Sequence, residues 1–383
     1  MFRLIAAALC ASVFVASGAA NANAKFVEFG PPDWAFAVSP TALNGDGSVL
    51  VGGISPFGNP SQAFRWSNGT FQMIDGVFVG YVTISATAVS MDGSVLVGSG
   101  SGADVNSDAF RWSDSTGVVR LGTLEGHNTS AANAVNADGS VLVGASRVGI
   151  DFSTSRAFRW TEIAGMQELA SLADDSQSIA NSVSADGSVA VGVSMRLSDG
   201  TARSVRWIDG SVMDLGTIRG GAGSFSEAMA VSADGSVIVG YEFSNSDNTS
   251  FAYRWTESDG MQSLGAIAGA QELYPTAVNA DGSVIVGLAY IDGSERAFLW
   301  TESAGLRLFA DVLSTDFGID LDGWLLQDVY SVSADGSVYV GRAITPTGAP
   351  SSWMFIIPTP GASMAFLMAV ALAAARRARP PAA

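Results

Sequence analysis

The sequence predicts an all-β chain folded as a seven-bladed β-propeller of four-stranded blades. Two observations support this fold class. The pattern Ala-Val-Ser-Ala-Asp-Gly-Ser-Val-x-Val-Gly recurs seven times at intervals of 46 to 54 residues, and units of this length are typical of propeller blades. The 383 residues also include 44 glycines and only 14% charged residues, a composition that favours short strands joined by tight turns.

Residues 1–24 are typical of a secretory signal peptide. Arg3 provides a positive start, residues 4–15 form an apolar stretch, and the sequence Ala-Asn-Ala at residues 22–24 forms a cleavage site. A buried N-terminal helix is the structural alternative. Cys10 is the one cysteine and lies in this segment. The mature chain is therefore expected to have no disulfide and no thiolate metal site.

The Asp-Gly pairs mark a hairpin in each of the seven units between residues 25 and 357. Asp-Gly between two alternating apolar runs predicts a tight turn in which both central residues have positive φ. We interpret the aspartates as turn residues rather than as ligands or catalytic carboxylates. These structural residues are Asp46, Asp92, Asp138, Asp186, Asp234, Asp281 and Asp335.

Each unit contains four predicted strands. In the fifth unit, residues 228–231 precede the turn and residues 236–240 follow it, and the fourth strand is at residues 261–265. The third strand reads Ala-Phe-Arg-Trp or a variant of it. Alternation places Phe and Trp on one face, which we expect to fill the space between adjacent sheets. The repeated tryptophans are Trp66, Trp112, Trp160, Trp207, Trp255 and Trp300.

The two ends of the array predict that the propeller closes. The seventh unit has a third strand at residues 352–355 but no fourth strand, whereas residues 26–30 look like a fourth strand without a unit before them. Pairing the N-terminal strand with the last blade completes seven blades and removes exposed sheet edges. An open β-solenoid is the alternative, and it would have no use for the isolated strand.

Residues 358–383 form a tail with a Pro-Thr-Pro-Gly start, a 14-residue apolar segment and an arginine cluster. The apolar segment is shorter than the ~20 residues that a spanning helix usually needs. The arrangement resembles the PEP-CTERM sorting signal of bacterial surface proteins, with Thr359 where that motif usually has Glu. The resemblance implies an outer-membrane bacterium, an export route linked to exopolysaccharide, and machinery that processes the tail. A plain C-terminal membrane anchor is the alternative.

The repeats themselves resemble the HAF family of extracellular repeat proteins. The resemblance covers residues 26 to about 355 and rests on the Ser-Ala-Asp-Gly-Ser-Val-x-Val-Gly hairpins, the Ala-Phe-Arg-Trp strands and the Gly-Met-Gln-x-Leu-Gly strands. The segment at residues 318–324 also matches. The resemblance implies an extracellular location, but neither a reaction nor a ligand.

The charge distribution argues against nucleic acid as a partner. All 36 acidic residues lie between the two terminal segments, where only 15 of the 19 basic residues are found. That middle section has a formal charge of −21 and would repel phosphates. We expect contact with a membrane only through the terminal segments.

Few residues outside the structural repeat pattern could take part in catalysis or in ligand binding. The arginine of the third strand is replaced by Leu299 and Met354 in the last two units, so it is interpreted as a packing or pairing group rather than as part of a ring of binding arginines. His127 is the one histidine and has no second His or Cys for a relay. No catalytic residue and no cofactor are predicted.

The longest insertion holds an acidic cluster before the last hairpin. Asp316, Asp320 and Asp322 are weak candidates for a metal site, and Asp328 lies near them in the sequence. The Asp-x-Asp-Gly pattern is similar to the start of a calcium loop, but the remaining ligand order and the closing Glu are missing. A solvated turn with Trp324 packed beneath it is the favoured interpretation.

These observations predict a non-catalytic binding module at the cell surface or outside the cell. Extracellular polysaccharide or surface proteins are the expected partners, although the binding residues cannot be named from the sequence. A polysaccharide-cleaving enzyme with a carboxylate pair in the channel loops is the first alternative, because a glycosidase needs only two carboxylates. A purely structural envelope or matrix protein is the second.

Overall fold

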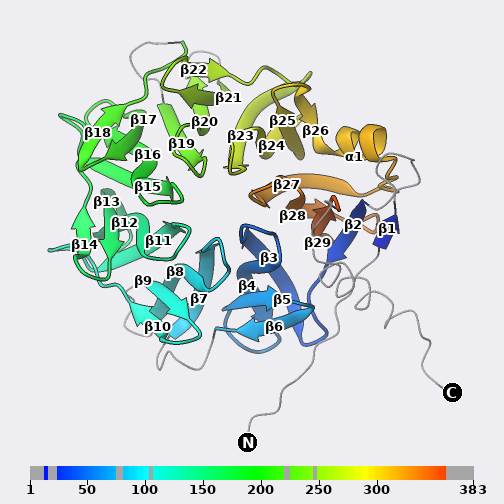
Figure 1. Cartoon of the computed structure of the whole chain (residues 1–383), viewed down its shortest axis with the longest axis horizontal. Coiled ribbons are helices and arrows are strands. Elements are labelled where there is room, and N and C mark those ends of the chain that lie inside the picture. The colour runs from blue at the N-terminus through cyan, green and yellow to red at the C-terminus, as the bar shows by residue number, and fades with distance from the viewer. Residues whose placement is uncertain are drawn as a thin grey trace, which may run out of the picture.

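The computed structural model describes residues 13–15, 24–74, 81–102, 107–219, 225–244 and 248–358. These residues form a β-propeller in which antiparallel four-stranded blades surround a central axis (Figure 1). The predicted all-β class and the four-stranded blades are confirmed. The predicted signal peptide, except for residues 13–15 and residue 24, and the predicted tail after residue 358 lie outside the described residues.

The strands follow one another in chain order within each repeat, from the centre outwards. In the first three repeats they are β3 (Ala35–Leu43), β4 (Val49–Pro56), β5 (Gln62–Ser67), β6 (Thr70–Met73), β7 (Tyr81–Val89), β8 (Val95–Gly102), β9 (Ser107–Ser113), β10 (Gly117–Arg120), β11 (Thr129–Val135), β12 (Val141–Val148), β13 (Asp151–Thr161) and β14 (Gly165–Glu168).

The later repeats continue the same order and include the helix found in the described residues. Their elements are β15 (Gln177–Val183), β16 (Val189–Arg196), β17 (Thr201–Ile208), β18 (Ser211–Asp214), β19 (Phe225–Val231), β20 (Ile238–Ser244), β21 (Thr249–Thr256), β22 (Gly260–Ser263), β23 (Ala270–Val278), β24 (Val284–Ile291), β25 (Ser294–Thr301), β26 (Gly305–Leu308), α1 (Phe309–Phe317), β27 (Leu325–Val332), β28 (Val338–Ile344) and β29 (Pro350–Ile356).

The first strand of each repeat lies nearest the axis, so β3, β7, β11, β15, β19, β23 and β27 line the central channel (Figure 1). All seven strands run toward their own Asp-Gly turn. The turns therefore gather at one end of the channel, and residues at matched distances from the turn lie at matched heights on its wall.

The number of separate blades differs from the prediction. Five blades, not seven, stand as separate sheets among the described residues, and the remaining repeats share one sheet of eight strands. A single parallel bridge between Ala202 of β17 and Phe225 of β19 joins the fourth and fifth repeats. One bridge is enough to merge two neighbouring repeats into one hydrogen-bonded sheet.

The N-terminal segment lies beside the last repeat. Strand β2 (Lys25–Phe29) pairs antiparallel with β29, with Phe26 opposite Phe355. Strand β1 (Val13–Val15) then pairs with the outer edge of β2. The sheet of the last repeat therefore takes its fourth strand from the beginning of the chain.

The backbone geometry of the Asp-Gly turns differs from the prediction. Only the glycine of each pair has positive φ: Gly47 has a φ of 71°, whereas Asp46 does not lie in the left-handed region. The backbone N–H of Gly47 donates to the carbonyl of Asn44, and the N–H of Asn44 donates to that of Val49. Five residues, 44–48, thus connect β3 to β4. A connection of this length is built on a type I turn followed by a left-handed residue, not on a two-residue turn.

The cores lie between neighbouring repeats. Phe64 and Trp66 of β5 pack with Val338 and Met354 of the last repeat. On the opposite face of the same blade, Ala63 packs with residues of the second repeat. The predicted aromatic face therefore fills the space between sheets, and seven such clusters are found in the described residues. No described helix is long and apolar enough to cross a membrane.

Candidate functional site

The repeated aspartates hold their own turns. The backbone N–H of Ser188 and the hydroxyls of Ser184 and Ser188 donate to the carboxylate of Asp186 at 2.7 to 2.9 Å. These hydrogen bonds lower the pKa of Asp186 to about 2. The same N–H to carboxylate bond occurs in the other six turns. The geometry agrees with a structural role.

The repeated arginine contacts the next repeat. The Nε atom of Arg65 donates to the carbonyl of Gly93 at 3.1 Å, and Arg111 makes the same bond to Gly139. Arg206 takes a different partner, Glu257, at 3.2 Å. Each of these three contacts joins neighbouring repeats, which agrees with a packing or pairing role for the repeated arginine.

His127 has a hydroxyl neighbour but no catalytic arrangement. Its Nδ1 lies 3.2 Å from the hydroxyl of Ser146. That hydroxyl donates to the carbonyl of Thr129 and is fully buried. A buried hydroxyl that already donates its proton to the backbone cannot act as a nucleophile toward a ligand in solvent.

The acidic insertion is partly helical, which the sequence interpretation missed. Asp316 lies at the end of α1 and forms an ion pair with Arg307 at 2.7 Å. Asp320 accepts a hydrogen bond from the backbone N–H of Asp322 at 2.9 Å. Trp324 is buried and contacts Phe26 edge to face, with ring centroids 5.6 Å apart. Within the described ranges, no group of three His, Cys, Asp or Glu side chains is arranged to hold a metal.

The turn end of the channel is narrowed by a ring of backbone hydrogen bonds. The N–H of the residue before each turn aspartate donates to the carbonyl of the corresponding residue in the next repeat, at 2.8 to 3.1 Å, and the last repeat donates to the first. We call these residues the turn ring. They are Gly45, Met91, Ala137, Ala185, Ala233, Ala280 and Ala334.

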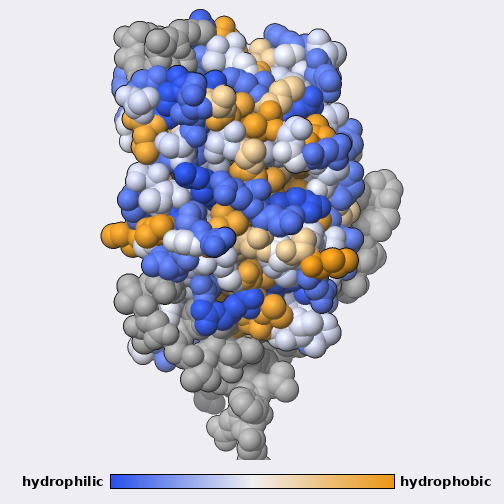
Figure 2. Space-filling model, turned by 90° about the vertical axis from the view of Figure 1, so that its left-hand side faces the viewer, coloured by the Kyte–Doolittle hydropathy of each residue, from blue (hydrophilic) through white to orange (hydrophobic). Residues whose placement is uncertain are grey.

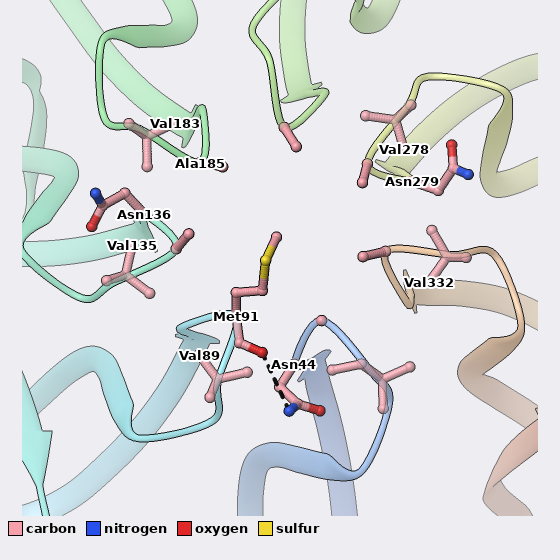
Figure 3. A pocket seen from close by; sticks show the side chains of 16 residues that line it. Asn44, Val89, Met91, Val135, Asn136, Val183, Ala185, Val278, Asn279 and Val332 are labelled. Atoms are coloured by element: carbon pink, nitrogen blue, oxygen red, sulfur yellow. Dashed lines mark hydrogen bonds between the residues drawn. The ribbon is translucent and has the colours of Figure 1, made fainter. Parts of the chain in front are cut away.

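Met91 occupies the middle of the turn ring (Figure 3). The pocket that remains there has a volume of about 170 Å³ and is lined mainly by Val, Ala and Asn side chains. Gly45 leaves room for Met91, because a Cβ atom at residue 45 would lie 2.5 Å from the Met91 Cγ. This end of the channel is therefore small, and its lining mixes apolar side chains with polar groups.

One cross-strand pair in each repeat varies strongly, whereas the turns are nearly constant. It joins the residue seven positions before the turn aspartate to the residue seven positions after it, and we call it the variable pair. In chain order the pairs are Ser39–Gly53, Ser85–Ser99, Ala131–Ala145, Ile179–Val193, Glu227–Tyr241, Tyr274–Leu288 and Asp328–Arg342.

Small side chains in the first two repeats leave a pocket of about 290 Å³. We call it the serine pocket. Where Ser99 and Ser101 stand in the second repeat, the fourth has Val193 and Met195. Ten residues line the pocket, seven of them serines: Ser39, Gly53, Ser55, Ser61, Thr83, Ile84, Ser85, Ser99, Ser101 and Ser107.

Two exposed aromatic rings lie at the same end of the first repeat. Phe36 and Phe57 are 61% and 62% exposed, and their ring centroids are 6.0 Å apart. Phe36 stands beside Ala37, which pairs with Ser55 of the serine pocket. Hydroxyl groups next to exposed aromatic rings can offer a sugar both hydrogen bonds and an apolar face.

The variable pairs of the fifth to seventh repeats differ greatly from this serine-rich wall. Tyr241, Tyr274 and Tyr290 form a row of rings with centroids 4.7 and 6.2 Å apart. Each hydroxyl donates to a glutamate at 2.8 to 3.1 Å: Tyr241 to Glu227, Tyr274 to Glu272, and Tyr290 to Glu295. We call these six residues the tyrosine array. Burial raises the pKa of Tyr274 to about 12.

Asp328 continues this wall in the last repeat. Its side chain lies on β27, only 4% of the residue is exposed, and its Oδ1 has no hydrogen-bond partner among the described residues. Burial raises its pKa to about 6 against the opposing effect of Arg342. Arg342 is held by Glu295 of the tyrosine array at 2.5 Å. Asp328 thus stands apart from Asp316, Asp320 and Asp322, with which the sequence had grouped it.

The sequence interpretation did not identify the variable pair, the serine pocket or the tyrosine array. A signal for them was present. An alignment of the seven repeats on the turn aspartate shows constant residues at the hairpin and divergent residues seven positions to either side. Only the strand register shows that these divergent residues pair and line one level of the channel.

Comparisons with solved structures place the fold among known propellers. An oligogalacturonate lyase from Vibrio parahaemolyticus matches with a TM-score of 0.60 and 14% identity, covering 92% of this chain and 97% of that one. The β-propeller domain of the Trilobed protease from Pyrococcus furiosus, described as having an open velcro topology, matches with a TM-score of 0.54 and 10% identity, covering 84% and 96%.

Enzymes that contain further domains also match. A prolyl endopeptidase matches with a TM-score of 0.56 and 11% identity over 84% of this chain and 50% of that one. These similarities show the fold alone. No family model matches the chain, and no curated protein matches its sequence.

Proposed function

We propose that this protein is an exported β-propeller that binds polysaccharide at the cell surface or outside the cell of a Gram-negative-type bacterium, without cleaving it. The serine pocket carries this proposal. Its seven serines and one threonine carry hydroxyls that can donate and accept hydrogen bonds, as the hydroxyls of a sugar require. The pairs Ser55–Ser61 and Thr83–Ser101 already share one hydrogen bond each and keep further donor and acceptor capacity. Among the described residues that line the pocket, none is a carboxylate, histidine or lysine that could act as an acid or base.

The proposed location rests on the terminal segments. The signal-peptide pattern and the PEP-CTERM-like tail both favour export, and the HAF-like repeats favour an extracellular role. On the outer face shown in Figure 2, the described apolar side chains form small patches separated by hydrophilic ones. This face therefore gives no sign of an extended protein-docking surface.

The proposal includes a closed ring of seven blades, in which the eight-stranded sheet holds two. Three observations support it: the seven hydrogen bonds of the turn ring return to the first repeat, seven hydrophobic clusters lie between neighbouring repeats, and β2 pairs with β29. A closed ring holds the variable pairs of distant repeats at one level, so that a long ligand can contact several of them.

Polysaccharide cleavage is the second candidate function. Asp328 is a carboxyl group whose pKa is raised to about 6 by burial, and Glu295 lies close enough to influence it. A glycosidase typically needs at least two carboxyl groups, held in environments that give them different pKa values. Cleavage would make Asp328 the proton donor.

The first experiment is sedimentation of the protein with exopolysaccharide from the producing bacterium, with reducing ends assayed in the same tubes. We expect binding without release of reducing ends. The double variant Ser99→Val, Ser101→Met should weaken binding at least tenfold, because valine and methionine are the residues of the fourth repeat and would fill the pocket.

The matched control is Ser263→Val, at an exposed position on the outer strand β22, which should bind like the unaltered protein. If the pocket variant bound the polysaccharide as tightly as the unaltered protein, the serine pocket would not be the binding site. Release of reducing ends that is abolished by Asp328→Asn would establish cleavage instead.

A further inference from the structure

The tyrosine array has a hydrogen-bond pattern that selects its ligand. All three tyrosine hydroxyls already donate to carboxylates, so they are not free to donate to a ligand. Phe225 stacks on the ring of Tyr241, and Asn181 and Gln327 also donate to Glu227 and Glu295. What the array still offers is the uncovered part of its rings and the remaining acceptor capacity of its glutamates. A group that only donates and carries positive charge suits both features, since an ammonium group has three donors and no acceptor.

The charge of this wall points the same way. Glu227, Glu272 and Glu295 supply three carboxylates, of which Glu295 is ion-paired with Arg342 at 2.5 Å, so these four groups have a formal charge of −2. The three tyrosines and three glutamates are half-buried rather than enclosed. A half-buried carboxylate keeps a stronger attraction for a cation than a fully solvated one.

Asp328 supplies an independent sign of a missing donor. The residue is 4% exposed, and its Oδ1 lacks a hydrogen-bond partner in the described part of the chain. A buried carboxylate oxygen without a donor is costly. A donor that reached this oxygen, which has almost no exposed surface in this structure, would remove that cost.

We propose that the tyrosine array binds the free ammonium groups of an amino-sugar polysaccharide. The proposal deepens the proposed function and rests on it, because the serine pocket would hold neutral parts of the same ligand. The ring faces of Tyr241 and Tyr274 contact the sugar and the cation, and the glutamates receive the ammonium hydrogens. Glu227, Tyr241 and Tyr274 belong to the variable pairs, as do Ser39, Ser85 and Ser99 of the serine pocket, so one polymer can contact both walls.

The test uses two hexasaccharides of equal length, one of β-1,4-linked glucosamine with free amines and one fully N-acetylated. Titration calorimetry of the full chain should show at least tenfold tighter binding of the free-amine hexamer at pH 6, and this preference should shrink when NaCl is raised from about 50 to about 500 mM.

Two variants assign the preference to the array. Glu227→Gln and Glu272→Gln keep the size of each side chain and remove its charge, and each should reduce the preference for the free-amine hexamer at least fivefold. The matched control is Glu257→Gln on the outer part of the fifth repeat, where the side chain is 81% exposed, and it should leave the preference unchanged. The serine-pocket variant should weaken both hexamers by the same factor.

The outcomes separate the two proposals. Equal binding of both hexamers would overturn the ammonium site and leave the polysaccharide module intact. Failure of both to bind would overturn the two proposals together. Tighter binding of a hexamer of glucuronic acid than of glucosamine would also overturn the site, since Arg342 would then be the recognition group. Far-ultraviolet circular dichroism of each variant checks that the fold is retained.

Discussion

At the scale of single residues, one register position shows how a repeat is adapted. Seven positions before the turn aspartate, the first repeat has Ser39, the fourth has Ile179 and the last has Asp328. The backbone pairing is the same in all three. The chemistry of the channel wall can therefore change from repeat to repeat while the ladder of hydrogen bonds is kept.

Asp328 makes the stability of the protein depend on pH. Its pKa in the folded state is about 6, above the value of 3.8 expected for an unperturbed aspartate. The folded protein thus keeps a proton that the unfolded chain releases. This carboxyl group favours folding below about pH 4. Its contribution is lost as the pH rises through 6.

Replacing Asp328 with Asn should therefore stabilise the protein at pH 7.5 and have little effect at pH 4. The shift of roughly two pKa units corresponds to at most about 3 kcal/mol in the free energy of unfolding. Urea unfolding of both proteins at the two pH values measures the difference. The seven turn aspartates are common to both proteins, so their acid sensitivity cancels. An equal effect at both pH values would show that the carboxyl group does not titrate as described.

At the scale of elements, the hairpin explains why the repeat is so regular. The glycine after each aspartate has positive φ and also lies against a valine of the preceding repeat. At Gly187 an added Cβ would lie 2.6 Å from the Cγ2 of Val141. The turn residue is thus part of the packing between neighbouring repeats as well as of its own hairpin.

Gly187→Ala and Gly200→Ala test this double role. Both positions have positive φ, 76° and 72°, so both substitutions carry the cost of a left-handed alanine, roughly 1 kcal/mol. Nothing lies within 4 Å of a Cβ at residue 200. We expect Gly187→Ala to lower the free energy of unfolding by about 1–3 kcal/mol more than Gly200→Ala. Equal losses in chemical denaturation would mean that the valine contact has no consequence.

At the scale of the whole molecule, the two ends of the chain meet in one sheet. Phe29 of β2 is buried against the first repeat, where its ring lies 5.4 Å from that of Trp66 and 6.4 Å from that of Phe64. The strand also pairs with β29 of the last repeat. Phe29 therefore links the last repeat to the first.

Phe29→Ala should lower the free energy of unfolding by about 3–5 kcal/mol, because it removes a buried ring and leaves a cavity. The control is Phe36→Ala, whose ring is 61% exposed and whose loss should have little effect on stability. Thermal unfolding followed by calorimetry measures both. If Phe29→Ala unfolded at the same temperature as the unaltered protein, β2 would not stabilise the junction and the closed ring would be overturned.

The sequence by itself determined the repeating part of this protein. The turn aspartates, the four strands and the aromatic face all follow from local preferences and from alternation, which act within a few residues. The N-terminal strand could also be placed, since an unpaired strand at one end matched a missing strand at the other. Even so, local rules gave the wrong turn geometry, because the length of the connection between two strands depends on their register.

Only the tertiary structure decided where the candidate site lies. Ser85 and Glu227 are far apart in the sequence, and nothing local to either residue indicates that they share one level of a channel. The seven inner strands surround one axis and run in the same direction. The register of each inner strand is set by its antiparallel pairing with the second strand of its own repeat. The burial of Asp328 is likewise a product of packing. A site made of the residues at which the repeats differ can be recognised only when the repeats lie next to one another in the structure.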